Sequence, residues 1–225
     1  MLKAILLDID GTLVRSNDEH AQAWFEVLRR YGYEVPWTEI RRWIGMGGDK
    51  ILSRVDKRLN DEEEPGKSIS RERQQLFLDK YVPQLRPQSG ARELLECFAA
   101  RGLLRVAATS AKREELGAIL KAGKIEDQID IATTSDEADR SKPDPDIIDR
   151  ALKKAAIAPE QAIYLGDTPY DVSASNRAGV AIIALTCGGW SGEDLREAAE
   201  IYATPADLLR QIEGSIVARR RAAQT

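Results

Sequence analysis

The sequence predicts an α/β fold, a doubly wound parallel sheet with a helical domain inserted after the first strand. Two observations predict the sheet: short apolar runs typical of buried strands recur along the chain, and amphipathic stretches typical of helices lie between them. A third observation predicts the insertion. Roughly a hundred residues separate the first apolar run from the second, although a crossover between parallel strands needs only one helix.

Composition is typical of a globular protein and argues against several functions. The chain has 225 residues, of which 43% are hydrophobic and 31% charged, and at this length roughly 70% of the unfolded surface can be buried. No apolar run approaches the ~20 residues of a membrane span, and no apolar signal-peptide core follows Met1. We therefore expect a cytoplasmic protein with no membrane partner. The net charge of −4 argues against nucleic acid as a partner.

The expected strands and helices follow one another in the order of a parallel sheet. The apolar runs that predict strands are Ala4–Leu7, Arg105–Ala108, Ile129–Ala132, Ile163–Leu165 and Val180–Leu185. The helices are predicted at Ala91–Ala100, Arg113–Ala122, Asp146–Ala155 and Tyr170–Ala178. Gly102, Gly123 and Gly179 lie near the C-terminal ends of three of these stretches, where glycine commonly ends a helix.

The insertion is predicted to be helical. Its helices are expected at Glu19–Arg30, Thr38–Ile44, Lys50–Leu59 and Arg71–Tyr81. The acidic run from 60 to 66 is predicted to be a solvated loop rather than a metal site. At the other end of the chain, residues 218–225, which include three arginines, are predicted to be a frayed tail. Cys97 and Cys187 have neither CxxC nor CxxH spacing, so we expect buried, reduced thiols.

Polar residues stand at the ends of the predicted strands, where ligands bind in open parallel sheets. Asp8 and Asp10 are two apart, so an extended backbone places both side chains on one side, and Gly11 permits a sharp turn after them. We expect the polar residues to converge at one edge of the sheet. They are Asp8 and Asp10 after the first strand, Thr109 and Ser110 after the second, Asp167 and Asp171 after the fourth, and Lys142 in the segment that leads into the helix before the fourth strand.

These side chains predict a metal-assisted phosphoryl-transfer site. Crowded carboxylates repel one another unless a cation joins them, and oxygen ligands without His or Cys suit a hard ion such as Mg²⁺. A lysine and two hydroxyls supply the positive charge and the donors that a bound phosphoryl group needs. A free carboxylate beside the metal can attack phosphorus and form an aspartyl phosphate, which divides one difficult hydrolysis into two easier steps.

At these positions the chain resembles the haloacid dehalogenase superfamily of hydrolases, in the subgroup of phosphoglycolate phosphatases and β-phosphoglucomutases. The resemblance covers the whole chain and rests on four motifs in order: DIDGT at 8–12, TS at 109–110, KPDPD at 142–146 and GDTPYD at 166–171. It implies a Rossmann-like catalytic core made of residues 1–14 and 87–225. Residues 15–86 would form a helical cap domain, and we use the name cap for this segment.

The resemblance also implies a role for each matching residue. Asp8 would be the nucleophile and a metal ligand, and Asp10 the general acid and base, with its backbone carbonyl on the metal. Asp167 would be a further ligand of the Mg²⁺, and Asp171 would lie behind the ligands. The implied protein is a Mg²⁺-dependent phosphatase acting on a small phosphate ester. Its phosphate-binding residues would be Thr109, Ser110 and Lys142.

Departures from the superfamily's patterns narrow the expected activity. Dehalogenases and phosphonate hydrolases lack the second acid of the first motif, so Asp10 argues against both. The β-phosphoglucomutases share a histidine at the position of His20, but they usually carry an arginine near Gly48 that is missing here. Phosphatase is therefore favoured, and phosphomutase stays open as the alternative. A receiver-like signalling domain needs no insertion, and a catalytically silent binding protein would most simply have lost Asp8 or Asp10.

The cap is expected to close over the site and to contact the leaving group. Its glycine-rich segment, residues 45–48, is the loop expected to enter the site. A structural role for His20 is an equally open interpretation, and the tryptophans of the cap are expected in its core. The candidate contacts in the cap are His20, Arg41, Gly47, Gly48 and Lys50.

Overall fold

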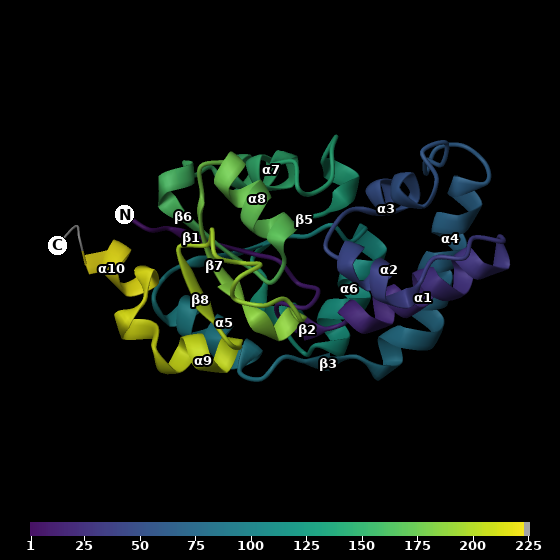
Figure 1. Ribbon diagram of the computed structural model, residues 1–225. Coiled ribbons are helices and arrows are strands. Elements are labelled where there is room, and N and C mark those ends of the chain that lie inside the picture. The colour runs from purple at the N-terminus through teal and green to yellow at the C-terminus, as the bar shows by residue number, and fades with distance from the viewer. Residues whose placement is uncertain (223–225) are drawn as a thin grey trace.

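The computed structural model describes residues 1–222, and its centre is a parallel sheet (Figure 1). The strand order β5-β4-β1-β6-β7-β8 places β1 in the middle, with later strands added on both sides of it. This order is that of a doubly wound sheet. The strands are β1 (Ala4–Leu7), β4 (Leu104–Ala108), β5 (Ile131–Thr133), β6 (Ala162–Gly166), β7 (Ala181–Leu185) and β8 (Glu200–Tyr202).

Helices cover both faces of the sheet because side chains alternate along each strand. Ile5 and Leu7 of β1 face one hydrophobic core, whereas Ala4 and Leu6 face another. The helices of this part are α5 (Ala91–Ala100), α6 (Arg113–Ala122), α7 (Asp146–Ala155), α8 (Pro169–Arg177), α9 (Pro205–Arg210) and α10 (Ile216–Ala222). Residues of α5, α6 and α9 belong to the first core, and residues of α7 and α8 belong to the second.

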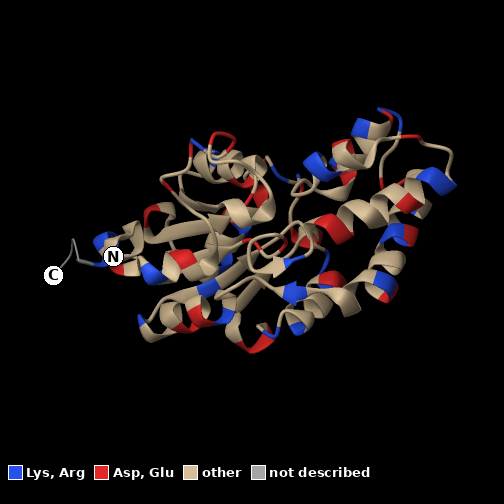
Figure 2. Cartoon of the chain, turned by 60° about the horizontal axis from the view of Figure 1, so that its bottom comes forward, with Lys and Arg blue, Asp and Glu red and all other residues tan. Residues whose placement is uncertain are grey.

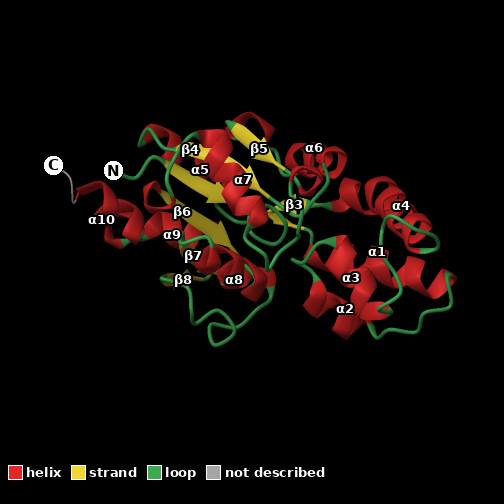
Figure 3. Cartoon of the chain, turned by 90° about the horizontal axis from the view of Figure 1, so that it is seen from above, coloured by secondary structure: helices red, strands yellow, loops and turns green. Residues whose placement is uncertain are grey.

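The helices of the cap form a lobe apart from the sheet (Figure 3). They are α1 (Asn17–Arg30), α2 (Trp37–Trp43), α3 (Gly48–Val55) and α4 (Gly66–Leu76), which continues as a π-helical turn (Phe77–Tyr81). Ala21, Trp24 and Leu28 recur at helical spacing on α1 and pack in a third hydrophobic core. The chain enters and leaves the lobe through β2 (Val14–Arg15) and β3 (Arg86–Pro87), which pair antiparallel, so the two crossings lie side by side.

The predicted fold class is confirmed, with corrections at some ends. The helix predicted at Lys50–Leu59 runs from Gly48 to Val55, because the Asp56 side chain accepts a hydrogen bond from the Arg58 backbone N–H and so favours a turn. Residues 218–222 belong to α10 and are not a frayed tail. The reason is that Val217 is buried and Arg219 pairs with Glu200. Residues 223–225 of that predicted tail lie outside the described residues.

The thiols and the surface complete the fold. Cys97 and Cys187 are free within the described chain but half-buried, which corrects the expectation of full burial. Acidic and basic residues are interspersed over the helices of both parts (Figure 2). Within residues 1–222, none of the helices combines the length and the apolar character that a membrane crossing requires.

Candidate active site

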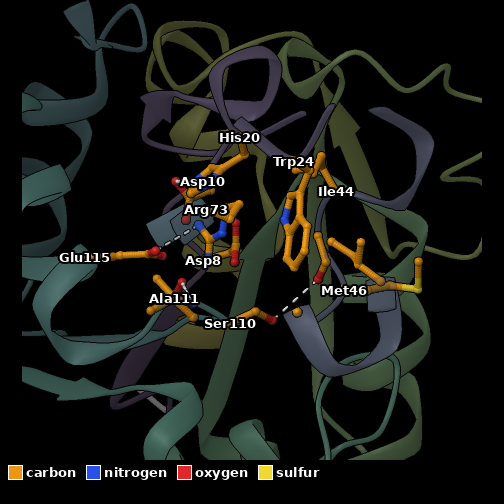
Figure 4. Close-up of a pocket in the computed structure, with 14 residues that line it drawn as sticks. Asp8, Asp10, His20, Trp24, Ile44, Met46, Arg73, Ser110, Ala111 and Glu115 are labelled. Carbon is orange, nitrogen blue, oxygen red and sulfur yellow. Dashed lines mark hydrogen bonds and ion pairs between the residues drawn. The ribbon is translucent and has the colours of Figure 1, made fainter. Parts of the chain in front are cut away.

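A cavity of about 60 Å³ lies where the carboxyl ends of β1 and β4 meet the cap. The sheet supplies one wall, and α1, α4 and the segment between α2 and α3 supply the other (Figure 4). Cap and sheet therefore share one site. The residues that line it are Asp8, Asp10, His20, Trp24, Ile44, Gly45, Met46, Gly48, Ile51, Arg73, Thr109, Ser110, Ala111 and Glu115.

Asp8 is buried at the end of β1, with 5% of its surface exposed. Its Oδ1 atom lies 2.5 Å from Lys142 Nζ, and its Oδ2 atom accepts a hydrogen bond of 3.1 Å from Thr12. Burial raises the pKa of Asp8 to about 7; Lys142 opposes this shift, while the Asp171 and Asp10 carboxylates add to it. The negative form of Asp8 is thus costly in the protein alone, and a further cation would stabilise it.

Asp10 has different partners on the cap side of the site. Ser16 Oγ donates a hydrogen bond of 2.5 Å to Asp10 Oδ1, and His20 Nε2 lies 3.0 Å from the same oxygen. Burial works against the charged form, but the charge and hydrogen bond of His20 and the hydrogen bond of Ser16 outweigh it and lower the pKa of Asp10. The His20 ring stacks on Phe77 at 3.8 Å between centroids. A buried aromatic contact therefore fixes the orientation of the histidine.

Three carboxylates form a cluster that could hold a metal ion. Oxygen atoms of Asp8, Asp167 and Asp171 lie within 4.8 Å of one another. Asp167 accepts hydrogen bonds from Thr12 (2.8 Å) and Asn17 (2.9 Å). Burial, then repulsion from Asp8 and Asp171, raises its pKa well above the usual value.

The donor set of this cluster fits Mg²⁺. Carboxylate oxygens are the ligands that hard cations prefer. A divalent cation would counter both the burial and the repulsion that raise the pKa values of Asp8 and Asp167. Glycines keep the space around Asp167 open, because a Cβ atom at Gly11 or Gly188 would collide with its carboxylate. The position of the Asp10 backbone carbonyl as a further ligand stays a prediction.

Lys142 is a buried cation that joins two of these acids. Its Nζ atom lies 2.5 Å from Asp8 Oδ1 and 2.7 Å from Asp171 Oδ1, and 1% of its side chain is exposed. Burial alone would lower its pKa, but Asp171 and Asp8 raise it well above the usual value. Asp171 is itself fixed by hydrogen bonds from the Thr168 hydroxyl (2.7 Å) and the Tyr164 hydroxyl (3.2 Å). The positive charge is therefore permanent and held in one place.

The hydroxyl residues after β4 complete the sheet side of the cavity. Thr109 is buried, and its Oγ1 atom accepts a hydrogen bond of 3.1 Å from the Ala111 backbone N–H. Ser110 Oγ reaches the Gly45 carbonyl of the cap at 3.5 Å. The structure thus brings Thr109 and Ser110 to the cavity that Asp8 and Asp10 line.

The candidate contacts of the cap divide into two groups. His20 and Gly48 line the cavity. Gly47 faces Ser141 and Asp49 instead, and Lys50 forms an ion pair of 2.5 Å with Asp144 of the core. Arg41 also lies away from the cavity: it pairs with Asp18 at 2.6 Å and donates a hydrogen bond of 2.6 Å to the Gly188 carbonyl.

Sequence reasoning missed a charged pair in the cavity wall. Arg73 of α4 and Glu115 of α6 are buried, and Arg73 Nη1 lies 2.8 Å from Glu115 Oε1. Neither residue belongs to one of the four motifs, and both stand on helices rich in exposed charges, so the pattern gave no signal. Thr12, Ser16 and Asn17 were also missed, although Thr12 lies within the first motif.

Comparison with known proteins gives consistent matches over nearly the whole chain. The profile of the haloacid dehalogenase-like hydrolase family matches residues 5–185. A phosphoglycolate phosphatase of Nitrosospira multiformis is 30% identical over 202 residues, which cover 87% of this chain and 88% of the relative. The crystal structure of a hydrolase from Pseudomonas syringae has a TM-score of 0.85 at 29% identity and covers 94% of this chain and 98% of its own. A candidate beta-phosphoglucomutase from Bacteroides vulgatus has a TM-score of 0.83 at 26% identity and covers 94% and 88%.

Proposed function

We propose, since this chain belongs to the haloacid dehalogenase-like hydrolase family, that it is a Mg²⁺-dependent phosphatase of a small phosphorylated metabolite. The observation that carries the proposal is the position of Asp8, whose carboxylate lies beside a permanent cation and within a cluster of acids suited to Mg²⁺. The similarity to a phosphoglycolate phosphatase supports the same reaction class. The cytoplasmic location expected from the sequence stays a prediction.

The reaction we propose has two displacements at phosphorus. An Asp8 oxygen forms a bond to phosphorus while the bond from phosphorus to the leaving oxygen breaks, and Asp10 gives a proton to that oxygen. Asp10 then takes a proton from water, whose oxygen attacks the phosphorus of the aspartyl phosphate. The bond between Asp8 and phosphorus breaks, inorganic phosphate leaves, and Asp8 returns as a carboxylate.

Fixed donors around Asp8 would orient the phosphoryl group in both steps. We assign phosphate binding to Thr109, Ser110 and Lys142, because hydroxyl and ammonium groups stabilise phosphoryl oxygens. Asp8, Asp167 and the backbone carbonyl of Asp10 would hold Mg²⁺, with Asp171 behind them. When bound, the ion supplies positive charge to the carboxylates and to the phosphate.

The same proposal covers the division of the chain. Residues 1–14 and 87–225 would form the catalytic core, and residues 15–86 the cap that closes over the leaving group. The shared cavity wall supports this division, because α1 and α4 meet the sheet edge there. Closure would exclude water from the site while the aspartyl phosphate exists.

A phosphomutase is the alternative, favoured by the structural match to a candidate beta-phosphoglucomutase and by the contact between His20 and Asp10. A mutase returns the phosphoryl group to a second hydroxyl, whereas a phosphatase passes it to water. The products separate the two: an assay that follows both inorganic phosphate and isomer formation decides between them. Isomer formation without phosphate release would reject the phosphatase.

A phosphate-release screen over small phosphorylated metabolites tests the proposal directly. We expect Mg²⁺-dependent release that chelation abolishes and that Asp8→Asn reduces to background, because the amide does not attack phosphorus. Asp139→Asn is the matched control, since this aspartate is exposed on the core. Full activity in excess chelator, or turnover by Asp8→Asn equal to that of the control, would overturn the assignment.

A further inference from the structure

The cavity contains a positive charge that the proposed reaction does not use. This charge is Arg73, which lines the cavity from α4 of the cap (Figure 4). Along the chain it lies far from the residues assigned to phosphate binding. We propose that Arg73 determines specificity by binding a second anionic group on the leaving part of the substrate. The substrate class would be short phosphate monoesters that also carry a carboxylate or a second phosphate. This inference rests on the phosphatase function proposed above.

The hydrogen bonding of Arg73 is incomplete. The residue is 8% exposed, and a guanidinium carries five N–H donors. Glu115 Oε1 lies 2.8 Å from Nη1, but Nε has no hydrogen-bond partner among the described residues, and Glu115 Oε1 is also without a well-aligned donor there. Buried polar groups of native proteins are nearly always satisfied. An acceptor supplied by a ligand would complete this set of donors.

The surroundings of Arg73 favour an anion over a neutral group. The guanidinium lies 5.2 Å from the centre of the Trp24 ring, and Ile44, Met46 and Ile51 line the same cavity. An apolar, buried environment strengthens the attraction between opposite charges. The planar fork of N–H donors on a guanidinium also matches a pair of carboxylate or phosphate oxygens.

The two ends of the cavity fit the two ends of such a substrate. Asp8, Thr109 and Ser110 come from the sheet, and Arg73 comes from the cap, yet all line one cavity of about 60 Å³. A phosphoryl group at Asp8 would direct its leaving group towards the cap. The small volume favours a short chain between the two anionic groups.

The charge of Glu115 provides a second test of the role proposed for Arg73. In the absence of substrate it neutralises Arg73, and it would repel a bound anion. Removing its charge should therefore strengthen the binding of doubly anionic esters. A merely structural ion pair between cap and core predicts the reverse, because its loss would weaken closure for every substrate.

Steady-state phosphate release from matched esters tests the proposal. The three esters differ in the group at the end away from the reacting phosphate. In the neutral probe, 2-hydroxyethyl phosphate, this group is a hydroxyl. In the anionic probes it is a carboxylate (2-phosphoglycolate) or a second phosphate (ethane-1,2-diyl bisphosphate). Arg73→Gln should raise KM for the preferred anionic probe about 10- to 100-fold and change KM for the neutral probe less than about 3-fold. The anionic probe whose KM rises more identifies the group that Arg73 binds. Glu115→Gln should lower KM for that probe and leave the neutral one unchanged.

The control is Gln74→Ala on the next residue of α4. Gln74 donates a hydrogen bond of 3.0 Å to Glu114 of α6 outside the cavity, so this variant loosens the same pair of helices and should not discriminate between esters. Thermal unfolding of each variant checks the fold, and the double variant Arg73→Gln with Glu115→Gln replaces the single one if that unfolds. Equal changes for all three esters would overturn the inference alone. A wild-type protein that releases phosphate from no ester would instead overturn the proposed function.

Discussion

The two aspartates at the end of β1 are shifted in opposite directions by their surroundings. Burial raises the pKa of Asp8 to about 7, whereas His20 and Ser16 hold that of Asp10 below its usual value despite its burial. The proposed roles require the opposite, an ionised Asp8 and an Asp10 that can give a proton. A divalent cation beside Asp8 lowers its pKa, and a phosphate dianion beside Asp10 raises its pKa. Ligands would therefore set the reactive protonation states.

Substituting Asp10 tests its role as the acid. Asp10→Asn should lower kcat for an alkyl ester such as methyl phosphate by about 10²- to 10⁴-fold, because the leaving oxygen receives no proton. With 4-nitrophenyl phosphate, whose leaving group is stable as an anion, the loss in the first step should be smaller. Rates of aspartyl-phosphate formation, measured by rapid quench on both esters, provide the comparison. Equal losses would contradict the assignment.

The pKa of Asp8 predicts a pH-dependent stability of the metal-free protein. A carboxyl whose pKa is raised from 3.8 to about 7 binds its proton more tightly when folded. Its contribution to stability is therefore full below pH 3.8 and is lost as the pH rises through about 7. Asn resembles the protonated carboxyl, so in EDTA the free energy of unfolding of Asp8→Asn should exceed that of the wild type by more than about 1 kcal/mol at pH 8.

Urea unfolding of both proteins at pH 4, 6 and 8 measures this difference. The difference should grow with pH in EDTA and shrink when Mg²⁺ is added, because the ion stabilises the folded wild type. A difference that is constant across this range would show that Asp8 keeps an ordinary pKa beside Lys142. Asp139→Asn again serves as the exposed control.

Among single residues, those that follow strands could be predicted as site residues from the sequence, but those that reach the site from helices could not. Asp8, Thr109 and Asp167 each come directly after a buried strand, and parallel topology alone brings them together. Arg73 and Glu115 meet across the cavity only because α4 of the cap packs near α6 of the core. That packing depends on the orientation of the cap, which periodicity does not encode.

Among the elements, those with strong periodicity were predictable and the short, exposed ones were not. The ends of α6 and α7 agree with the prediction to the residue. No apolar run predicted β8, because its three residues are half-buried or exposed; this strand is held by backbone pairing with β7. The pair β2 and β3 was also missed, because strands of two residues are too short to show an alternating pattern.

We expect substitution of Gly47, which precedes α3, and of Gly48, its first residue, to have different effects. A Cβ atom at Gly47 would collide with Ser141 and Asp49, which share a hydrogen bond of 2.5 Å next to Lys142. Gly47→Ala should therefore cost about 1–3 kcal/mol of stability and lower kcat for every ester alike. At Gly48 the added Cβ would lie 3.3 Å from Trp24 in the cavity. Gly48→Ala should raise KM for a bulky phenyl phosphate more than for methyl phosphate.

Kinetics of both variants on both esters, with urea unfolding, check this division. Gly102→Ala would not serve as a control because its φ is +70°, whereas Gly192 has open space at its Cβ position and an ordinary φ, so Gly192→Ala is the matched control. Ester-dependent effects at Gly47 or uniform effects at Gly48 would contradict the assignment of these two positions.

The whole molecule is held in a closed arrangement by polar contacts between cap and core. Besides Arg73 and Glu115, they include the pair of Lys50 with Asp144, and the hydrogen bond of 2.6 Å from the Tyr170 hydroxyl to the Arg42 carbonyl. The last two lie outside the residues that line the cavity. The partly exposed contacts among them are individually weak, so closure would be reversible on the timescale of turnover.

The ion pair of Lys50 with Asp144 predicts how closure contributes to binding. Lys50 and Asp144 lie 2.5 Å apart with 27% and 17% of their side chains exposed, and a partly exposed pair contributes up to about 1 kcal/mol. Lys50→Gln should therefore raise KM up to about 5-fold for neutral and anionic esters alike, because it shifts the cap towards an open state without touching the leaving group. A double-mutant cycle with Asp144→Asn, at low and high salt, measures the coupling. A change confined to anionic esters would instead place Lys50 in contact with the substrate.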